Sequence, residues 1–240
     1  SSMRRSSSRS CWGSSTIGGV ISPLKSSLVP ILLSAGDDML RYTTKRLNLV
    51  MIERRHLDHL LQLWTDPQVM SNVGFPLGLH PDDIDLESYL SDAEEIAPTG
   101  RIRGIHMAVE LKDGTLIGEA KIASPDEQGM SEPDVKLLPD YWGRSLGTEI
   151  VKLLIDECFS LYPDCQAVQF TPNIENTSAI RLYCGLGSEV VGDGFFPPEA
   201  SSLRGFAGVS YLVMQTCREV WEENKRDVLR QEKVNSVSGP

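Results

Sequence analysis

Apolar and polar positions divide the chain from about residue 43 onward into short segments of two kinds. Over Arg46–Glu53 apolar and polar residues alternate, as in a β-strand with one buried face. Over His56–Trp64 the apolar residues recur at spacings of three and four, as in an amphipathic helix. Asp66-Pro67 ends this helix, because the residue before a proline avoids the helical conformation. A second helix is predicted over Pro81–Glu95, where a proline and two aspartates occupy the first turn.

The middle of the chain predicts a hairpin, a further strand and the longest helix. The strand-like runs Ile105–Leu111 and Thr115–Ile122 are joined by Lys-Asp-Gly at 112–114, and an Asp-Gly pair between two such runs indicates a hairpin. A strand follows at Asp134–Leu138, and apolar residues at helical spacing predict a helix over Gly147–Leu161.

The last third of the chain continues this alternation of strands and helices. Its predicted segments are the strand Ala167–Thr171, the helix Asn176–Leu186 closed by Gly187, the strands Val190–Gly194 and Val209–Gln215, and a helical or frayed tail over 218–234. This order of elements predicts a mixed α/β layer structure with a sheet at its centre.

The first 36 residues differ in composition from the rest, since twelve are serine, four are Arg or Lys, and none is acidic. Such a segment cannot build a core of its own. Its composition resembles an organellar transit peptide, and a plain disordered extension or an upstream start is the slightly favoured alternative. We therefore expect a Ser-rich basic extension over 1–42, one folded domain over 43–217 and a charged tail over 218–240.

The composition argues against several classes of protein. The net charge is −10, whereas a general nucleic-acid binder needs a basic surface for phosphate contacts. The chain has no apolar run of about 18 residues that would predict a membrane span. The five cysteines form no CxxC pair and lie away from the four histidines, so no metal site is expected. Scattered thiols indicate a reducing compartment, and we expect a cytoplasmic protein, with organellar import as the alternative.

One stretch, YWGRSLGTEIV at 141–151, carries the candidate chemistry. If a helix opens at Gly147, the amides of residues 144–148 have no intrahelical partner and lie at the positive end of the helix dipole, which suits a pyrophosphate. The residues that would hold it are Gly143, Arg144, Ser145, Leu146, Gly147 and Thr148. The two glycines have no Cβ and allow close backbone approach, the arginine adds a cation, and the threonine adds a hydroxyl. From this stretch alone, an ordinary glycine turn with a helix cap is equally well supported.

Around this stretch, LLPDYWGRSLGTEIVKLLIDECF resembles the acyl-CoA-binding segment of the GNAT superfamily of N-acetyltransferases, and more narrowly that of its RimJ/RimL-like branch. Two further stretches resemble the same family independently: TTKRLNLVMIERRHLDHLLQLWTDPQVM at 43–70 and NTSAIRLYCGLGSEVVGDG at 176–194. The family motif [QR]xxGx[GA] has its last small residue at Gly147 and its middle glycine at Ser145. Because serine has a Cβ, this departure predicts weaker or slightly shifted phosphate binding. The resemblance spans roughly 43–217.

The resemblance implies an α/β GNAT fold and acetyl-CoA as the cofactor. In this fold a central, mixed, mostly antiparallel sheet of seven strands splays apart between strands four and five, and about four helices flank it. Acyl-CoA lies in the gap, and its pantetheine arm pairs with backbone groups at the end of strand four. In this chain, that position falls on Lys136, Leu137 and Leu138, acting through their backbone.

The resemblance also implies roles for two residues of the third stretch. Asn176 matches an asparagine that contacts the cofactor arm or caps the following helix, and the two roles can coexist. Tyr183 matches a position near the thioester sulfur, where its hydroxyl can protonate the departing thiolate. A buried core aromatic with a satisfied hydroxyl is the alternative for Tyr183.

The reaction implied is a direct attack of an amine on the thioester, which requires that an ammonium group first lose a proton. Glu119, on the third strand of the family's sheet, is the first candidate for the base, because the central strands face the acceptor cleft. The other candidates are Glu132, Asp134 and His106. A solvated carboxylate on a strand face is the alternative for Glu119.

Three functions remain open from the sequence. The first is acetylation of a protein N-terminal α-amine or a similar primary amine. The second is acetylation of a small cationic amine, a polyamine or an aminoglycoside, which would suit an acidic protein. The third is an acyl-CoA-binding module without catalysis. The acceptor is expected between the loops at 74–82 and 194–208, and the chain is expected to be a monomer or a homodimer.

Overall fold

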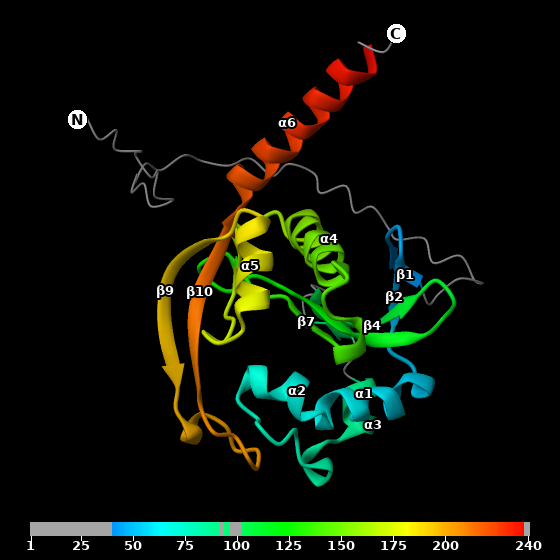
Figure 1. Cartoon of the computed structure of the whole chain (residues 1–240), viewed down its shortest axis with the longest axis vertical. Helices are drawn as coiled ribbons and strands as arrows, with labels where there is room; N and C mark the ends of the chain where they lie inside the picture. The colour runs from blue at the N-terminus through cyan, green and yellow to red at the C-terminus, as the bar shows by residue number, and fades with distance from the viewer. Residues whose placement is uncertain (1–39, 92–93, 97–101, 238–240) are drawn as a thin grey trace. The chain divides into compact units, whose positions relative to one another are not determined.

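The computed structural model describes residues 40–91, 94–96 and 102–237 (Figure 1). The predicted N-terminal extension at 1–42 therefore lies outside the described residues up to residue 39. The folded part begins earlier than predicted, because a short strand, β1 (Leu40–Thr43), pairs antiparallel with β2 (Leu47–Met51).

Two sheets form the centre of the fold (Figure 1). The first has the order β1-β2-β4-β5-β7, with β3 paired to β4, and all its pairs are antiparallel. The second has the order β6-β8-β10-β9, in which only β6 and β8 are parallel. The remaining strands are β3 (Glu94–Ile96), β4 (Ile102–Leu111), β5 (Leu116–Ala123), β6 (Met130–Ser131), β7 (Asp134–Leu137), β8 (Ala167–Phe170), β9 (Glu189–Phe196) and β10 (Val209–Cys217).

The mixed, mostly antiparallel α/β fold is confirmed, and β7 and β8 belong to different sheets, as the predicted splay requires. The prediction of one seven-stranded sheet is wrong: the described residues form one six-stranded and one four-stranded sheet. The strands that the pattern missed, β1, β3 and β6, have at most four residues each. A segment of that length is too short to show a period of two, and only its pairing partner makes it a strand.

The α-helices number six in the described residues, where about four were expected. They are α1 (Leu57–Thr65), α2 (Pro67–Met70), α3 (Leu86–Ser91), α4 (Leu146–Leu161), α5 (Thr177–Gly185) and α6 (Arg218–Val237). Short 3-10 turns lie at Arg54–His56, Ser71–Val73, Pro81–Asp83, Pro139–Tyr141 and Pro198–Ala200. The 112–114 hairpin turn is confirmed, and Gly114 adopts the left-handed φ of +86° that this turn needs.

The predicted helix over Pro81–Glu95 is wrong. A 3-10 turn ends at Ile84, whose backbone is extended, and a new helix, α3, begins only at Leu86. Asp85 caps this helix, because its carboxylate accepts a hydrogen bond from the amide of Ser88 at 3.0 Å. The segment after α3 pairs with β4 as β3, so long-range strand pairing overrides the helical pattern there.

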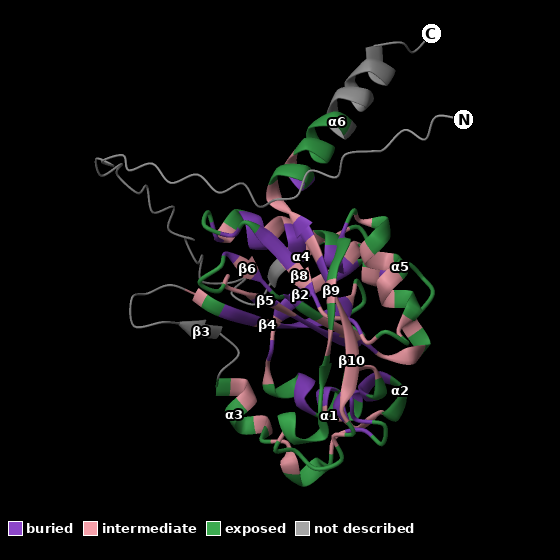
Figure 2. Cartoon of the chain, turned by 90° about the vertical axis from the view of Figure 1, so that its left-hand side faces the viewer, coloured by how far each residue is buried: buried purple, intermediate pink, exposed green. Residues whose placement is uncertain are grey.

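Two apolar clusters lie on the two faces of the first sheet. On one face α4 buries Ile150, Val151, Leu154 and Ile155 against strand residues such as Leu47, Met107 and Ile117. On the other face α1 and α2 bury Leu60, Leu63, Val69 and Met70 against Val50 and Ala108. Figure 2 shows α4 as a mostly buried helix, whereas the outer side of α5 and the described part of α6 are exposed. The first sheet is thus covered on both faces, and its β7 edge is left open toward the second sheet.

Candidate active site

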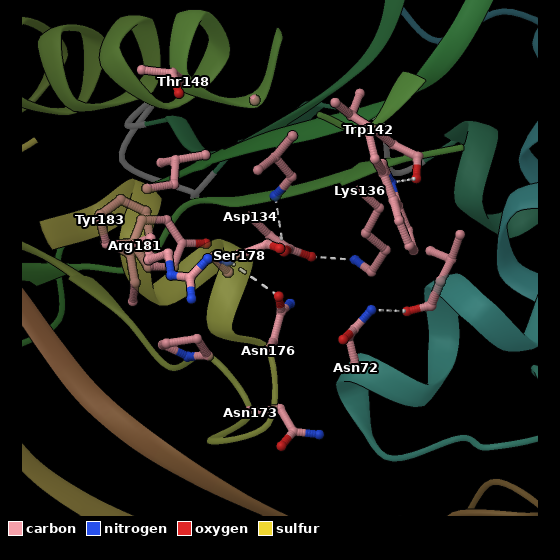
Figure 3. A pocket seen from close by; sticks show the side chains of 18 of the residues that line it. Asn72, Asp134, Lys136, Trp142, Thr148, Asn173, Asn176, Ser178, Arg181 and Tyr183 are labelled. Carbon is pink, nitrogen blue, oxygen red and sulfur yellow. Dashed lines mark hydrogen bonds and ion pairs between the residues drawn. The ribbon is translucent and has the colours of Figure 1, made fainter. Parts of the chain in front are cut away.

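A cavity of about 950 Å³ opens between β7 and β8. Its walls come from the turn after α2, from β7, from the glycine loop before α4, from β8 and from α5 (Figure 3). Of the predicted cofactor residues, those that line it are Lys136, Leu137, Gly143, Ser145, Leu146, Gly147, Thr148 and Asn176. Leu138 and Arg144 do not line it, and the Arg144 guanidinium instead lies 5.4 Å from the centre of the Tyr141 ring.

The glycine loop has the backbone that an anion-binding turn requires. Gly143 has a φ of +70°, and Ser145, immediately before α4, is left-handed as well, with φ 59° and ψ 19°. Left-handed residues next to a helix start direct successive amides into a concave site for an anion. Gly147 serves packing instead, since a Cβ on it would lie 3.1 Å from the side chain of Leu182 on α5. Gly143 is therefore favoured by its left-handed backbone, whereas Gly147 is favoured by the close approach of α5.

On β7, alternate residues direct their backbone toward β5 and toward the cavity. The carbonyl of Lys136 faces Gly118 of β5, and the amide of Leu138 donates to the carbonyl of Ile117 at 2.9 Å. Leu137 lies between them and therefore turns its backbone toward the gap. Its carbonyl accepts a hydrogen bond from the indole of Trp142 at 2.7 Å. Of the three residues predicted to act through their backbone, only Leu137 is oriented for this role.

The side chain of Lys136 is the part of that residue that reaches the site. Its ammonium contacts the carboxylate of Asp134 (Figure 3). It also lies 3.3 Å from Glu119 Oε1. Burial opposes its charge, but the two carboxylates outweigh burial and raise the pKa of Lys136 above its usual value. The same carboxylate–ammonium contact outweighs burial at Asp134 and lowers the pKa of its carboxyl. A backbone role was expected for Lys136, but the structure places a permanent ammonium group there.

Asn176 immediately precedes α5 and Tyr183 lies on it, and both line the cavity. Asn176 caps this helix, because its Oδ1 accepts from the amide of Ala179 at 3.1 Å. The Tyr183 ring stacks on Phe170 of β8, with ring centres 4.1 Å apart and planes 8° from parallel. Burial raises the pKa of Tyr183, and the nearby charge of Asp134 raises it further, so its hydroxyl keeps its proton. Tyr183 thus lines the cavity with a protonated hydroxyl.

A second cavity of about 330 Å³ adjoins the first, and Asp134 and Lys136 line both. Glu119 lies in it and is buried, with 7% of its surface exposed, so it is not the solvated carboxylate of the alternative interpretation. Its carboxylate accepts from Trp64 Nε1 at 2.8 Å and from the Tyr89 hydroxyl at 2.8 Å. The ion pair with Lys136 is its third contact.

The other candidates for the base do not all line the same cavity. His106 lines the smaller one, and its Nδ1 lies 3.0 Å from the Tyr89 hydroxyl, which connects it to Glu119. Glu132 lines only the larger cavity, where it accepts from the hydroxyl of Thr171 at 2.8 Å. Asp134 lies at the junction. Only Glu119 and His106 therefore belong to the smaller cavity alone.

The two loops predicted to border the acceptor contact each other. The amide and guanidinium of Arg204 bind Asp83, at 3.0 Å to Oδ2 and 2.8 Å to Oδ1. The rings of Phe75 and Phe206 lie 5.1 Å apart. The turn after β9 is thereby attached to the turn before α3, and Asp83 lines the smaller cavity.

Several site residues were missed by the sequence pattern. Trp64 and Tyr89 hold Glu119, although both appeared only as members of helices. Arg181 on α5 lines the larger cavity and makes no ion pair or hydrogen bond with the residues that the structure describes. Figure 3 shows its guanidinium directed into the cavity beside Ser178. A helical position facing a ligand cannot be told from a solvated one by spacing alone, so the sequence offered no signal for these residues.

Among the described residues, no group of three or more His, Cys, Asp or Glu side chains is arranged to hold a metal ion. No helix in that part of the chain is long and apolar enough to cross a membrane.

The larger cavity fits an acyl-CoA. It combines a backbone turn with amides at a helix N-terminus, an open strand edge for the pantetheine arm and a protonated tyrosine.

Comparisons with known proteins agree with this geometry. A family model described as an acetyltransferase (GNAT) domain matches residues 46–189. The fold is similar to a spermidine N-acetyltransferase from Vibrio cholerae in complex with CoA and spermine, with a TM-score of 0.57, 17% identity, and coverage of 74% of this chain and 99% of that chain. It is similar to the aminoglycoside acetyltransferase AAC(6')-Ib in complex with coenzyme A, with a TM-score of 0.55, 19% identity, and coverage of 75% and 99%.

A third similar structure is a GNAT-family acetyltransferase from Bacillus anthracis, with a TM-score of 0.55, 14% identity, and coverage of 75% of this chain and 99% of that chain. At these identities the likeness shows the fold. No curated protein matches the sequence. The family model covers more than half of the chain, and the chain therefore belongs to the GNAT family of N-acetyltransferases, acyltransferases whose cofactor is acetyl-CoA.

Proposed function

We propose that this protein transfers an acetyl group from acetyl-CoA to a primary amine that enters the smaller cavity as an ammonium ion. The observation that carries this proposal is the pair of adjoining cavities, which meet at Asp134 and Lys136. One cavity has the features of a cofactor site, and the other brings carboxylates to the place where an amine must arrive.

In this proposal the glycine loop holds the cofactor's pyrophosphate. The amides of Ser145, Leu146 and Gly147 lie at the N-terminus of α4, where a negative charge is stabilised. Arg181 supplies a cation for the outer phosphate groups. Leu137 and Asn176 lie along the path of the pantetheine arm, and acetyl-CoA itself supplies the thioester carbonyl that the amine attacks.

Tyr183 is the proposed acid. Its hydroxyl holds its proton at neutral pH and lines the larger cavity, so it can give that proton to the departing sulfur. The stacking on Phe170 fixes the ring plane, which limits the positions that the hydroxyl can take.

Glu119 is the proposed proton acceptor. An ionised carboxylate has about four acceptor sites. Trp64, Tyr89 and Lys136 use three of them, which leaves one for the ammonium of the acceptor. The Tyr89 hydroxyl donates to Glu119 and lies 3.0 Å from His106 Nδ1, so it connects Glu119 to the imidazole and holds the carboxylate in place.

The first candidate for the acceptor is a protein N-terminal α-amine, and the resemblance of residues 137–159 to the RimJ/RimL-like branch supports it. The second is a small cationic amine, such as a polyamine or an aminoglycoside. It is favoured by the carboxylates of the smaller cavity, Asp83, Asp85, Glu119 and Asp134, which outnumber its cations, Lys121 and Lys136.

A panel of amines tests the proposal. Release of free CoA thiol is measured with acetyl-CoA and peptides bearing free N-termini, the same peptides with blocked N-termini, spermidine, and an aminoglycoside. Turnover with free but not blocked peptides would establish the first candidate, and turnover with the small amines alone the second. Thermal stabilisation by acetyl-CoA without turnover on any amine would instead indicate a binding module without catalysis.

Tyr183→Phe tests the acid. We expect kcat to fall by roughly 100-fold, the lower end of what a positioned acid contributes, with little change in the affinity for CoA. The variant keeps the ring that stacks on Phe170, so the fold is preserved. An unchanged kcat would remove Tyr183 from the mechanism.

A further inference from the structure

We propose that Arg46, which does not line the cavity, is a positioning residue of the cofactor site. Its guanidinium holds the glycine loop with its amides turned toward the ligand. The inference rests on the proposed binding of the pyrophosphate at this loop. Arg46 lies on the far side of the loop and is not among the residues that line the cavity.

The contacts of Arg46 reach across about one hundred residues of sequence. Its Nη1 donates to the carbonyl of Arg144 at 2.8 Å, and its Nη2 donates to the carbonyl of Ser145 at 3.0 Å. Its Nε and its own amide bind the two carboxylate oxygens of Glu149 at 2.7 and 2.9 Å. Arg46 immediately precedes β2, so the start of a core strand is connected to the first turn of α4.

These contacts decide where the amides of the loop point. In a trans peptide the carbonyl of one residue and the amide of the next point in opposite directions. The carbonyls of Arg144 and Ser145 both turn toward the guanidinium, so the amides of Ser145 and Leu146 turn away from it. Ser145 and Leu146 line the cavity. A ligand in the cavity therefore meets donors and not carbonyl oxygens.

The same contacts support a strained residue. Ser145 has a left-handed backbone, which a residue with a Cβ adopts at an energetic disadvantage. Its side chain makes no capping hydrogen bond to α4. Its carbonyl, held by Arg46, is thus one of the few contacts that keep this conformation in place.

Arg46 also removes an electrostatic conflict at this helix terminus. Glu149 lies in the first turn of α4, where its charge would repel a pyrophosphate. Burial disfavours the charge of Glu149, but hydrogen bonds from Thr44 and Arg46 outweigh burial and hold its pKa below the usual range. Glu149 is therefore a carboxylate, and the guanidinium beside it compensates for its charge. Both groups are needed, because Glu149 orients the guanidinium and Arg46 neutralises Glu149.

The test compares two thioesters that differ in the pyrophosphate. Acetyl-CoA carries it, and S-acetylpantetheine lacks it along with the nucleotide. Dissociation constants are measured by calorimetry, directly for acetyl-CoA and by competition for S-acetylpantetheine. In Arg46→Gln we expect the dissociation constant of acetyl-CoA to rise roughly tenfold, and that of S-acetylpantetheine to change by less than about twofold, since each tenfold is about 1.4 kcal/mol.

Lys112→Gln is the matched control. The Lys112 ammonium binds the carbonyl of Leu47 at 2.8 Å and Asn48 Oδ1 at 2.8 Å, so it supports the same end of β2 without reaching the loop. This variant should bind both thioesters as the wild type does. Should Arg46→Gln fail to fold, Glu149→Gln carries the test, because it removes the charge that orients the guanidinium and keeps the side chain's size.

Three outcomes contradict the inference in different ways. Equal weakening of both thioesters by Arg46→Gln would mean that Arg46 acts on the fold as a whole. Gly143→Val, which opposes the left-handed φ of +70°, tests the loop directly. If Gly143→Val weakens acetyl-CoA selectively and Arg46→Gln does not, the positioning role is wrong while the pyrophosphate site stands. If neither variant distinguishes the thioesters, the proposed site itself is wrong.

Discussion

Gly118 on β5 is a glycine that the fold requires for space alone. It is buried, and its φ lies outside the left-handed range. A Cβ placed on it would lie 2.1 Å from the carbonyl oxygen of Lys136 and 3.0 Å from the Cα of Leu137. Both atoms belong to the backbone of β7, the strand that borders the cofactor cavity. Gly118→Ala therefore pushes β7 away from β5 and cannot be accommodated by a side-chain rotation.

The size of the effect follows from the distance. Real Cβ atoms keep at least about 3.0 Å from a carbonyl oxygen, so β7 must move by roughly 0.9 Å, the difference between 3.0 and 2.1 Å. Overpacking of this kind costs about 1–3 kcal/mol of stability. A displacement near 1 Å in a catalytic site can lower the rate by about 100-fold. We expect both effects, since Lys136 and Leu137 move with the strand.

Gly185→Ala provides the matched comparison. Gly185 is the last residue of α5, and no atom lies within 4 Å of a Cβ placed on it. The same methyl group should there raise the free energy of unfolding, by up to about 1 kcal/mol, because alanine favours a helix more than glycine does.

Urea unfolding followed by tryptophan fluorescence gives the free energy of unfolding of both variants, and calorimetry gives their affinity for acetyl-CoA. The two substitutions should have opposite signs in stability, and only Gly118→Ala should weaken acetyl-CoA. The reasoning is refuted if Gly118→Ala is as stable as the wild type and binds acetyl-CoA equally well, because β5 and β7 would then tolerate the extra atom.

Two further predictions concern the loop and the pH dependence of stability. Ser145→Gly should raise the melting temperature by up to about 3 °C, because it relieves a left-handed backbone strain of about 1 kcal/mol and the greater freedom of the unfolded chain offsets only part of this gain. The same substitution should tighten acetyl-CoA binding. A lower melting temperature would contradict this prediction. Burial, followed by the charge of Arg55, lowers the pKa of His56, so His56 contributes stability that is present above pH about 6.5 and is lost as the pH falls below it. Urea unfolding at pH 7.5 and 5.5 should show a larger loss for the wild type than for His56→Gln, and equal losses would exclude His56 as the cause.

The sequence predicted the segments whose pattern is local. The helix over Gly147–Leu161 and the hairpin around 112–114 were predicted within one to three residues, because an apolar face or a turn signal repeats within the segment itself. The glycine loop was also predicted from its own residues, because its short motif requires a left-handed backbone conformation. The prediction of a single helix over Pro81–Glu95 was wrong for the converse reason, because its local helical pattern competes with the long-range pairing of β3 to β4.

In the candidate site, most residues of the predicted motifs line the larger cavity, but Leu138 and Arg144 do not, and residues that act through distant partners were not predicted. Tyr183 and Ser145 line the cavity as the motifs predicted. The family resemblance implied a backbone role for Lys136, because it indicates which strand the pantetheine arm follows but not which way each carbonyl of that strand turns. Trp64 and Tyr89 were missed, since they become site residues only through the carboxylate of Glu119, 55 and 30 residues away.

The amino-acid sequence by itself therefore determined the family, the cofactor and the position of the glycine loop before α4, because these depend on short motifs with their own backbone geometry. Only the tertiary structure decided how the site is assembled. It brought Lys136 between two carboxylates, joined the larger cavity to the smaller one and placed Arg46 behind the loop. Those relations depend on the register of strands and on contacts across many residues, and no local pattern of apolar and polar positions encodes them.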